Sequence, residues 1–391
     1  MKPIDLSISS ELPADADRAL LIGRVHIEGT GAVLVHVTRE SVHDISHLAP
    51  TCSELLELPD LPQVLRSFRG RLVGTTAEIL ANSAQERRSK GQPWFLAPCD
   101  LQAIKASGVT FVSSMLERVI EEQARGDPAK AEAVRKAVVA IIGDDLSRVR
   151  PGSPEAARLK DALIVQRVWS QYLEVGIGPD AEIFTKSQPM SAVGTGADIG
   201  IHPKSEWNNP EPEIVLAVNS RGRIAGATLG NDVNLRDFEG RSALLLGKAK
   251  DNNASCAIGP FIRLFEGSFG LDEVRRAKLA MRVDGPDGFS LDGESSMAMI
   301  SRDPEDLVAQ AIGPNHQYPD GFVLFLGTMF APTKDRYAPG QGFTHAAGDI
   351  VTVSTPALGA LVNRVERSDR IAPWTMGAGA LMKNLAARGL L

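Results

Sequence analysis

Three acidic residues stand close together near the middle of the chain. Glu211 and Glu213 are separated by one residue, and Asp232 follows after a polar turn and a second short apolar run. Residues i and i+2 of a strand point to the same face, so the two glutamates would share one face. Like charges this close repel unless a cation or a shared proton lies between them. Three oxygen ligands suit a hard ion such as Mg²⁺, with Mn²⁺ and Ca²⁺ as alternatives, whereas solvated acids at a strand end are the competing interpretation.

The segments around these acids have the composition of strands. Residues 214–218 read Ile-Val-Leu-Ala-Val, a β-branched and aliphatic run that directly follows Glu213. Residues 219–222 read Asn-Ser-Arg-Gly, which is a turn composition. A second short strand then leads to Gly-Asn-Asp-Val-Asn at 230–234. The pattern predicts two strands that carry the three acids.

The order of these motifs resembles the fumarylacetoacetate hydrolase family. A Glu-x-Glu pair is followed by Asn-Asp-Val, and then by a lysine ahead of Ser-Cys and Gly-Pro-Phe. The resemblance implies that Glu211, Glu213 and Asp232 are metal ligands. It places the active-site lysine of the family at Lys250, with Lys248 in the same Gly-Lys-Ala-Lys run as the alternative.

The resemblance also implies roles for three residues outside this stretch. Glu182 precedes the ligand strand at an interval similar to that of the catalytic glutamate in sugar-acid dehydrating members, and it is the candidate for proton transfer; a plain surface acid is the alternative. Lys186 lies in the aromatic-then-lysine pattern of the family and is a candidate substrate-binding residue. Thr328 ends an apolar strand in Gly-Thr, like the family threonine that contacts the substrate carboxylate, although a threonine in a strand is usually structural.

The family resemblance implies an α+β, mostly β fold with a rolled-sheet catalytic domain, which we place at residues 91–391. We expect residues 1–90 to form a smaller β-rich N-terminal α+β domain. In it, the apolar runs 19–27 and 32–38 flank a glycine-containing turn and predict a hairpin, and helices are expected over 52–58 and 61–68. Members of the family commonly pair through a broad interface, so the resemblance implies a homodimer or a dimer of dimers.

The remaining local patterns predict scaffold. Amphipathic helices are expected over 127–142 and 154–174, and a hairpin with an Asp-Gly turn is expected around 284–287. Asp303 ahead of Pro304 has the pattern of a helix N-cap. The glycines of 194–200 do not have Rossmann spacing and no helix-forming run follows them, which argues against a dinucleotide site.

Composition excludes several classes of protein. The chain has 391 residues, of which 43% are hydrophobic and 23% charged, as in ordinary globular proteins. Its net charge of -6 argues against electrostatic binding of nucleic acid or of an anionic membrane. No run approaches the roughly 18 apolar residues of a spanning helix, and the start of the chain lacks the apolar core of a signal peptide, so we expect a cytoplasmic protein. The three cysteines are scattered along the chain, and we expect each of them to be a small buried side chain.

A metal held by three carboxylates would bind a small 2-oxo acid through its keto and carboxylate oxygens, which acidifies the protons on C3. A hydroxyl on C4 could then leave as water, with Glu182 as general acid, whereas a carbonyl on C4 would favour attack by water and C–C cleavage. The interval from Glu213 to Asp232 is shorter than that expected in acylpyruvate-cleaving members of the family. The additional N-terminal unit, together with the motifs GTMFAP and GKAKDNNASCAIGPF, is similar to the branch that acts on 2-keto-3-deoxy sugar acids. We therefore expect a Mg²⁺-dependent dehydratase that forms 2-oxoglutarate semialdehyde.

Two alternatives stay open. The first is a hydrolase of acylpyruvates or diketo sugar acids. No His-Glu lid pair like that of hydrolytic family members is evident in the sequence, although His202 or His345 could replace its histidine. The second is a non-catalytic binding module that keeps the fold.

Overall fold

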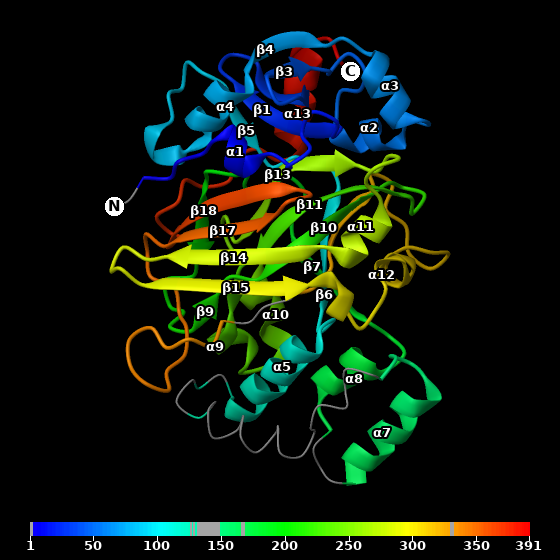
Figure 1. Cartoon of the computed structure of the whole chain (residues 1–391), viewed down its shortest axis with the longest axis vertical. Coiled ribbons are helices and arrows are strands. Elements are labelled where there is room, and N and C mark those ends of the chain that lie inside the picture. The colour runs from blue at the N-terminus through cyan, green and yellow to red at the C-terminus, as the bar shows by residue number, and fades with distance from the viewer. Residues whose placement is uncertain (1–2, 126, 128–129, 131–148, 166–168, 329–331) are drawn as a thin grey trace.

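Two β-sheets packed against each other form the body of the molecule (Figure 1). The computed structural model describes residues 3–125, 127, 130, 149–165, 169–328 and 332–391. The largest core cluster takes apolar side chains from both sheets, including Leu216, Leu229, Val283 and Val353. The mostly β, α+β fold expected from the family resemblance is confirmed.

The larger sheet has eleven strands and contains the segments that carry the acids. Its order is β4-β3-β2-β1-β13-β11-β10-β16-β6-β7, with β5 paired to β1. The pairing is antiparallel except between β16 and β6. Its strands are β1 Leu21–Ile27, β2 Gly31–Val37, β3 Ser41–Asp44, β4 Arg71–Thr75, β5 Trp94–Leu96, β6 Ala103–Gly108, β7 Glu182–Ser187, β10 Pro212–Val218, β11 Ile224–Asp232, β13 Cys256–Leu264 and β16 Phe322–Phe325.

The second sheet has five strands in the order β15-β14-β17-β18-β8 and covers one face of the first. Its strands are β8 Asp198–Ile201, β14 Lys278–Asp284, β15 Ser290–Ser296, β17 Ile350–Thr355 and β18 Gly359–Arg367. A two-stranded ladder, β9 Asn208–Asn209 with β12 Asn234–Leu235, lies next to the acids in sequence.

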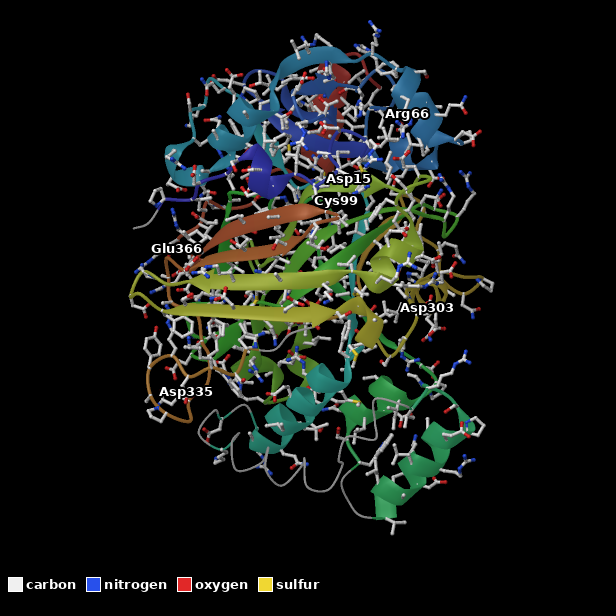
Figure 2. All side chains as sticks on the ribbon, viewed as in Figure 1. Asp15, Arg66, Cys99, Asp303, Asp335 and Glu366 are labelled. Carbon is white, nitrogen blue, oxygen red and sulfur yellow. The ribbon has the colours of Figure 1, made fainter. Side chains whose placement is uncertain are left out.

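The N-terminal strands continue the larger sheet. The predicted hairpin is confirmed as β1 and β2, and β1 also pairs antiparallel with β13. Arg263 of β13 forms a two-pronged ion pair with Asp15, with both nitrogen–oxygen distances at 2.7 Å, and Figure 2 shows Asp15 where the N-terminal strands meet the rest of the sheet. The proposed division at residue 90 stays a prediction, because one sheet runs through both parts.

Helices cover the two ends of the molecule (Figure 1). The C-terminal helix lies beside the N-terminal strands, where Arg388 donates to the carbonyl of Ala32 over 3.0 Å. At the opposite end, α5, α7 and α8 gather around their own apolar cluster. The helices are α1 Ile8–Glu11, α2 Cys52–Glu57, α3 Leu61–Ser67, α4 Thr76–Ser83, α5 Val112–Ala124, α7 Pro154–Val165, α8 Gln171–Ile177, α9 Arg236–Glu239, α10 Leu246–Lys250, α11 Leu271–Arg276, α12 Pro304–Ala311 and α13 Ala378–Ala387.

Several local predictions can be compared directly with these elements. The Asp303 cap is confirmed, because its side chain accepts from the backbone N–H of Glu305. The helix expected over 154–174 is two helices, α7 and α8, and most of the helix expected over 127–142 lies outside the described residues. All three cysteines are buried and free, as predicted. No helix in the described ranges has both the length and the apolar character needed to cross a membrane.

Replacing Glu11 with Gln should stabilise the protein at alkaline pH. Glu11 is 1% exposed, and burial raises its pKa from 4.5 to about 7 despite hydrogen bonds from Ser7 and Ser10. The folded state therefore holds a proton that the unfolded state releases, so this group lowers the unfolding free energy as pH rises from 4.5 to about 7. We expect Glu11→Gln to gain about 3 kcal/mol over wild type at about pH 8, and little at about pH 4.

Urea unfolding at both pH values measures this difference. Glu28→Gln is the matched control, because Glu28 is exposed and its replacement should leave the curves unchanged. Equal gains at acid and alkaline pH would show that the buried charge of Glu11 is not the cause.

Candidate metal centre and active site

The three acids predicted to bind a metal converge in the structure. One carboxylate oxygen from each of Glu211, Glu213 and Asp232 lies within 4.8 Å of the other two, and all three residues are buried. The register of β10 and β11 produces this arrangement, because the Asp232 N–H donates to the Glu211 carbonyl over 2.9 Å. A second hydrogen bond joins the same segments, because the side-chain oxygen of Asn231 accepts from the Glu211 N–H over 3.0 Å.

The backbone of Gly327 fixes the carboxylate of Glu213. The backbone N–H of Gly327 donates to Glu213 Oε2 over 2.7 Å. Gly327 has φ of 99°, a left-handed conformation that favours glycine, and a Cβ there would lie 1.9 Å from Thr110 Oγ1. Thr110 is itself held by the Leu326 carbonyl at 2.6 Å. The Gly-Thr motif recognised in the sequence therefore supports a predicted metal ligand as well as carrying Thr328.

Two lysines contact the acids from α10 and β7. Lys250, which is buried, lies with its Nζ 3.0 Å from Asp232 Oδ2 and also contacts Glu211 Oε2. Lys248 is exposed and does not line the pocket, so the geometry favours Lys250 as the active-site lysine. Lys186 has its Nζ 3.0 Å from Asp232 Oδ1, on the opposite side of that carboxylate.

The position of Lys186 differs from the expected contact with substrate. Its side chain is completely buried, and its Nζ is surrounded by Asp232, the carbonyls of Lys250 and Val233, and the hydroxyl of Ser255. These oxygen atoms all belong to the protein, and Lys186 is not part of the pocket lining. These contacts place Lys186 against Asp232 and the end of α10, and its role in substrate binding stays a prediction.

The electrostatics of the cluster follow from its burial and its excess of acids. Burial raises the pKa of Glu213 well above its usual range, and the carboxylates of Asp232 and Glu211 raise it further. Burial also acts to raise the pKa of Asp232, but Lys250 and Lys186 hold it below its ordinary value. Burial acts to lower the pKa of Lys250, but Asp232 and Glu211 raise it. Without a metal, burial and the neighbouring carboxylates thus favour the protonated form of Glu213.

Glu182 lies in the same pocket, at the first position of β7. It pairs with Gly108 of β6, and burial raises the pKa of Glu182 to about 7, with a further contribution from Glu239. Thr328 also lines the pocket. The structure therefore brings six of the predicted site residues together around one small pocket with room for about one water molecule: Glu182, Glu211, Glu213, Asp232, Lys250 and Thr328. Their individual roles stay predictions.

Two charged residues that line the pocket, Arg118 and Glu239, were not identified from the sequence. Arg118 of α5 contacts Glu211 and lies 2.9 Å from Glu239 of α9. Both side chains are buried. In the sequence they belong to ordinary amphipathic segments, and only the tertiary fold brings them to the acids. The one available signal was that Arg118 interrupts the apolar face of its helix.

The described pocket fits a divalent cation. Five carboxylates line it, but only two cationic side chains do, with Lys186 directly behind Asp232. The three clustered acids offer an all-oxygen donor set, which suits Mg²⁺, Mn²⁺ or Ca²⁺. Burial raises the pKa of Glu213 and the carboxylates of Asp232 and Glu211 raise it further, so a cation between the three acids would favour their charged forms. Glu211, Glu213 and Asp232 are therefore the residues that would hold the ion.

Substituting Gly108 with Ala should reduce turnover without reducing metal affinity. A Cβ at Gly108 would lie 2.0 Å from Glu182 Oε2, so the methyl group would displace that carboxyl while leaving Glu211, Glu213 and Asp232 in place. We expect kcat to fall about 100-fold, in the range found when a general acid or base is lost. Steady-state kinetics with calorimetric titration of Mg²⁺ measures both quantities.

Gly379→Ala in α13 is the control, since nothing lies within 4 Å of a Cβ there. It should change neither quantity. Normal kcat in Gly108→Ala would remove Glu182 from the reaction.

The fold and the buried acids define a class of protein: a two-sheet domain with a candidate carboxylate metal centre beside a buried lysine. The family described as "Fumarylacetoacetate (FAA) hydrolase C-terminal" matches residues 170–366, half of the chain, and this segment contains the six predicted residues of the pocket. The chain belongs to the fumarylacetoacetate hydrolase family.

Two similar proteins carry dehydratase names. The "2-dehydro-3-deoxy-D-arabinonate dehydratase" of Saccharolobus solfataricus is 27% identical over 233 residues, which cover 59% of this chain and 71% of that protein. The "Probable 2-keto-3-deoxyxylonate dehydratase" of Haloferax volcanii is 30% identical over 194 residues, which cover 50% of this chain and 63% of that protein.

Solved structures show the same fold. The apo form of 2-keto-3-deoxy-D-arabinonate dehydratase has a TM-score of 0.60 and 19% identity, and the comparison covers 89% of this chain and 99% of that one. A structure of that enzyme "complexed with magnesium and 2,5-dioxopentanoate" has a TM-score of 0.59, also with 19% identity, and covers 90% and 100%. At this identity the likeness establishes the fold alone.

Proposed function

We propose that this protein is a Mg²⁺-dependent dehydratase that converts a 2-keto-3-deoxy-pentonate of the xylonate or arabinonate type into 2-oxoglutarate semialdehyde. The observation that carries the proposal is the pocket, in which three clustered carboxylates, a buried lysine and a carboxyl group with a pKa near 7 face one small cavity. The names of the two relatives and the magnesium-bound neighbour support the choice of substrate class and of metal.

The residues of the pocket suit an elimination of water. When bound, a divalent cation would act as a Lewis acid toward a 2-oxo acid and increase the acidity of its C3 protons. The ammonium of Lys250 is placed to stabilise negative charge that develops on the substrate oxygens. Thr328 lines the same pocket and is the proposed contact of the substrate carboxylate.

Glu182 is the proposed proton carrier. A carboxyl group with a pKa of about 7 is present in both forms at neutral pH. As a carboxylate it can take one proton from C3, and as an acid it can return that proton to the hydroxyl leaving C4. The substrate has then lost one molecule of water and has a C3–C4 double bond. Loss of a proton from C5 and gain of one at C3 moves this bond to C4–C5, and the resulting enol tautomerises to the aldehyde. One group thus serves both half-steps.

The histidines considered for a hydrolytic reaction lie elsewhere. Neither His202 nor His345 lines the pocket: His345 Nδ1 lies 2.9 Å from Asp349 Oδ2, and His202 packs edge-on against Phe238. We therefore place C–C hydrolysis second. Substrate range, a homodimer or dimer of dimers, and a cytoplasmic location remain proposals.

Incubation of the purified protein with Mg²⁺ and 2-keto-3-deoxy-xylonate or -arabinonate, followed by NMR, tests the reaction. We expect the aldehyde signal of 2-oxoglutarate semialdehyde, loss of the reaction with EDTA, and no pyruvate. In a parallel incubation with an acylpyruvate, which has a carbonyl at C4, release of pyruvate and of the second carboxylic acid would establish the hydrolase instead. No turnover of either substrate class, with metal bound and Glu211 and Glu213 intact, would favour a non-catalytic binding module.

A further inference from the structure

Arg118 spans a predicted metal ligand and a second carboxylate. Its Nη2 donates to Glu211 Oε1, and its Nη1 donates to Glu239 Oε2 over 2.9 Å. The side chain is 7% exposed and lines the pocket. One nitrogen of the permanently charged Arg118 guanidinium therefore hydrogen-bonds to a carboxylate of the candidate metal centre. The other nitrogen hydrogen-bonds to Glu239, which lies outside the three clustered acids.

A bound cation changes what this guanidinium can contact. Glu211 has Arg118 on one oxygen and Lys250 on the other, so protein cations occupy the carboxylate that the metal would use. A divalent ion would compete with Arg118 for that charge. A buried N–H donor that loses its acceptor costs about 1–3 kcal/mol, so the displaced nitrogen needs another oxygen in the pocket.

The position of Arg118 itself is fixed by contacts that do not involve the ligands. Glu239 holds its Nη1, and the neighbouring Glu117 lies 3.1 Å from Arg236 of α9. Arg236 in turn stacks on Trp207, with 4.4 Å between the guanidinium carbon and the ring centre. The helix can therefore stay in place while Nη2 alone changes partner.

We propose that Arg118 exchanges Glu211 for the carboxylate of the 2-oxo acid when the cation binds, and so couples cation binding to substrate binding. Arg118 is then a substrate-positioning residue that also opposes cation binding in the absence of substrate. The identity of the acid rests on the proposed function, whereas the competition with the cation does not. The two parts predict effects of opposite sign, which general damage to the site would not produce.

The first test is calorimetric titration of the metal-free protein with MgCl₂. Arg118→Met removes the competing charge and should bind Mg²⁺ about tenfold more tightly than wild type. Arg236→Gln is the matched control, because Arg236 pairs with Glu117 of the same helix and is not among the residues that line the pocket. It should leave the Mg²⁺ affinity unchanged.

The second test is titration with pyruvate at saturating Mg²⁺. Pyruvate is a 2-oxo acid with no C4 hydroxyl to lose, so it reports binding without turnover. Arg118→Met should bind it about tenfold more weakly, as expected for loss of one hydrogen bond between charged groups. Arg236→Gln should bind it like wild type.

Arg118→Met removes the arginine that pairs with the buried Glu239, and this loss could impair folding. The second variant is therefore the double substitution Arg118→Met and Glu239→Gln, which removes both charges of the pair. It should show the same opposite changes. Unchanged or weaker Mg²⁺ binding in both variants, or pyruvate that binds variants and wild type alike or not at all, would overturn the inference. Failure of the proposed function would appear separately, as absence of sugar-acid dehydration by wild type.

Discussion

Glu213→Gln should abolish Mg²⁺ binding and turnover, yet leave the metal-free protein at least as stable as wild type. Glutamine keeps an oxygen that can accept from the Gly327 N–H at the 2.7 Å position, but it cannot supply a negative charge. The raised pKa of Glu213 shows that a charge there is unfavourable until a cation arrives. We expect kcat/KM to fall about 10³-fold, the scale of losing a preorganised electrostatic contribution.

Thermal unfolding with and without Mg²⁺ separates the two effects. In wild type, Mg²⁺ at about 100 times its Kd should add about 2.7 kcal/mol of stability, and in Glu213→Gln it should add almost none. Loss of metal-free stability by several kcal/mol would mean that Glu213 is a structural acid. A normal Mg²⁺ response would mean that it is not a ligand.

Lys250→Met should abolish turnover while metal binding persists. The ammonium of Lys250 lies 3.0 Å from Asp232 and also contacts Glu211, so its removal takes away a pocket cation but none of the three predicted ligands. We expect kcat to fall about 10²- to 10⁴-fold. Mg²⁺ affinity should stay equal or increase, because one competing positive charge is gone.

Lys248→Met is the matched control, since Lys248 lies on the same short helix and is exposed. If Lys248→Met loses turnover and Lys250→Met keeps it, Lys248 is the active-site lysine. Loss of Mg²⁺ binding in Lys250→Met would show that the lysine maintains the centre rather than acting on substrate.

Local patterns were enough to predict most of the elements that carry the acids. Alternation and β-branched residues predicted the strands before and after the 219–222 turn, and the structure has them as β10 and β11. Their antiparallel register then sets Glu211 beside Asp232, as the chemistry of clustered acids requires. The Asp303 cap and the first hairpin were predictable for the same reason, because their stabilising contacts are close in sequence.

Features that depend on distant contacts were not predictable in this way. Glu239 and Arg118 meet only because α5 packs against α9, and no local pattern records that pairing. The same holds for the parallel pair of β8 and β18 and for the C-terminal helix that lies on β2. For Lys186 the family pattern identifies the residue but not the direction of its ammonium, which faces Asp232 and backbone carbonyls, and its role in substrate binding stays a prediction.

A crystal grown with Mn²⁺ in place of Mg²⁺ tests the central claim most directly, because Mn²⁺ scatters anomalously and accepts the same oxygen ligands. The account predicts one anomalous peak bonded to an oxygen of each of Glu211, Glu213 and Asp232, with Arg118 moved off Glu211. Absence of a peak there, with Arg118 and Lys250 still on Glu211 at saturating Mn²⁺, would contradict it.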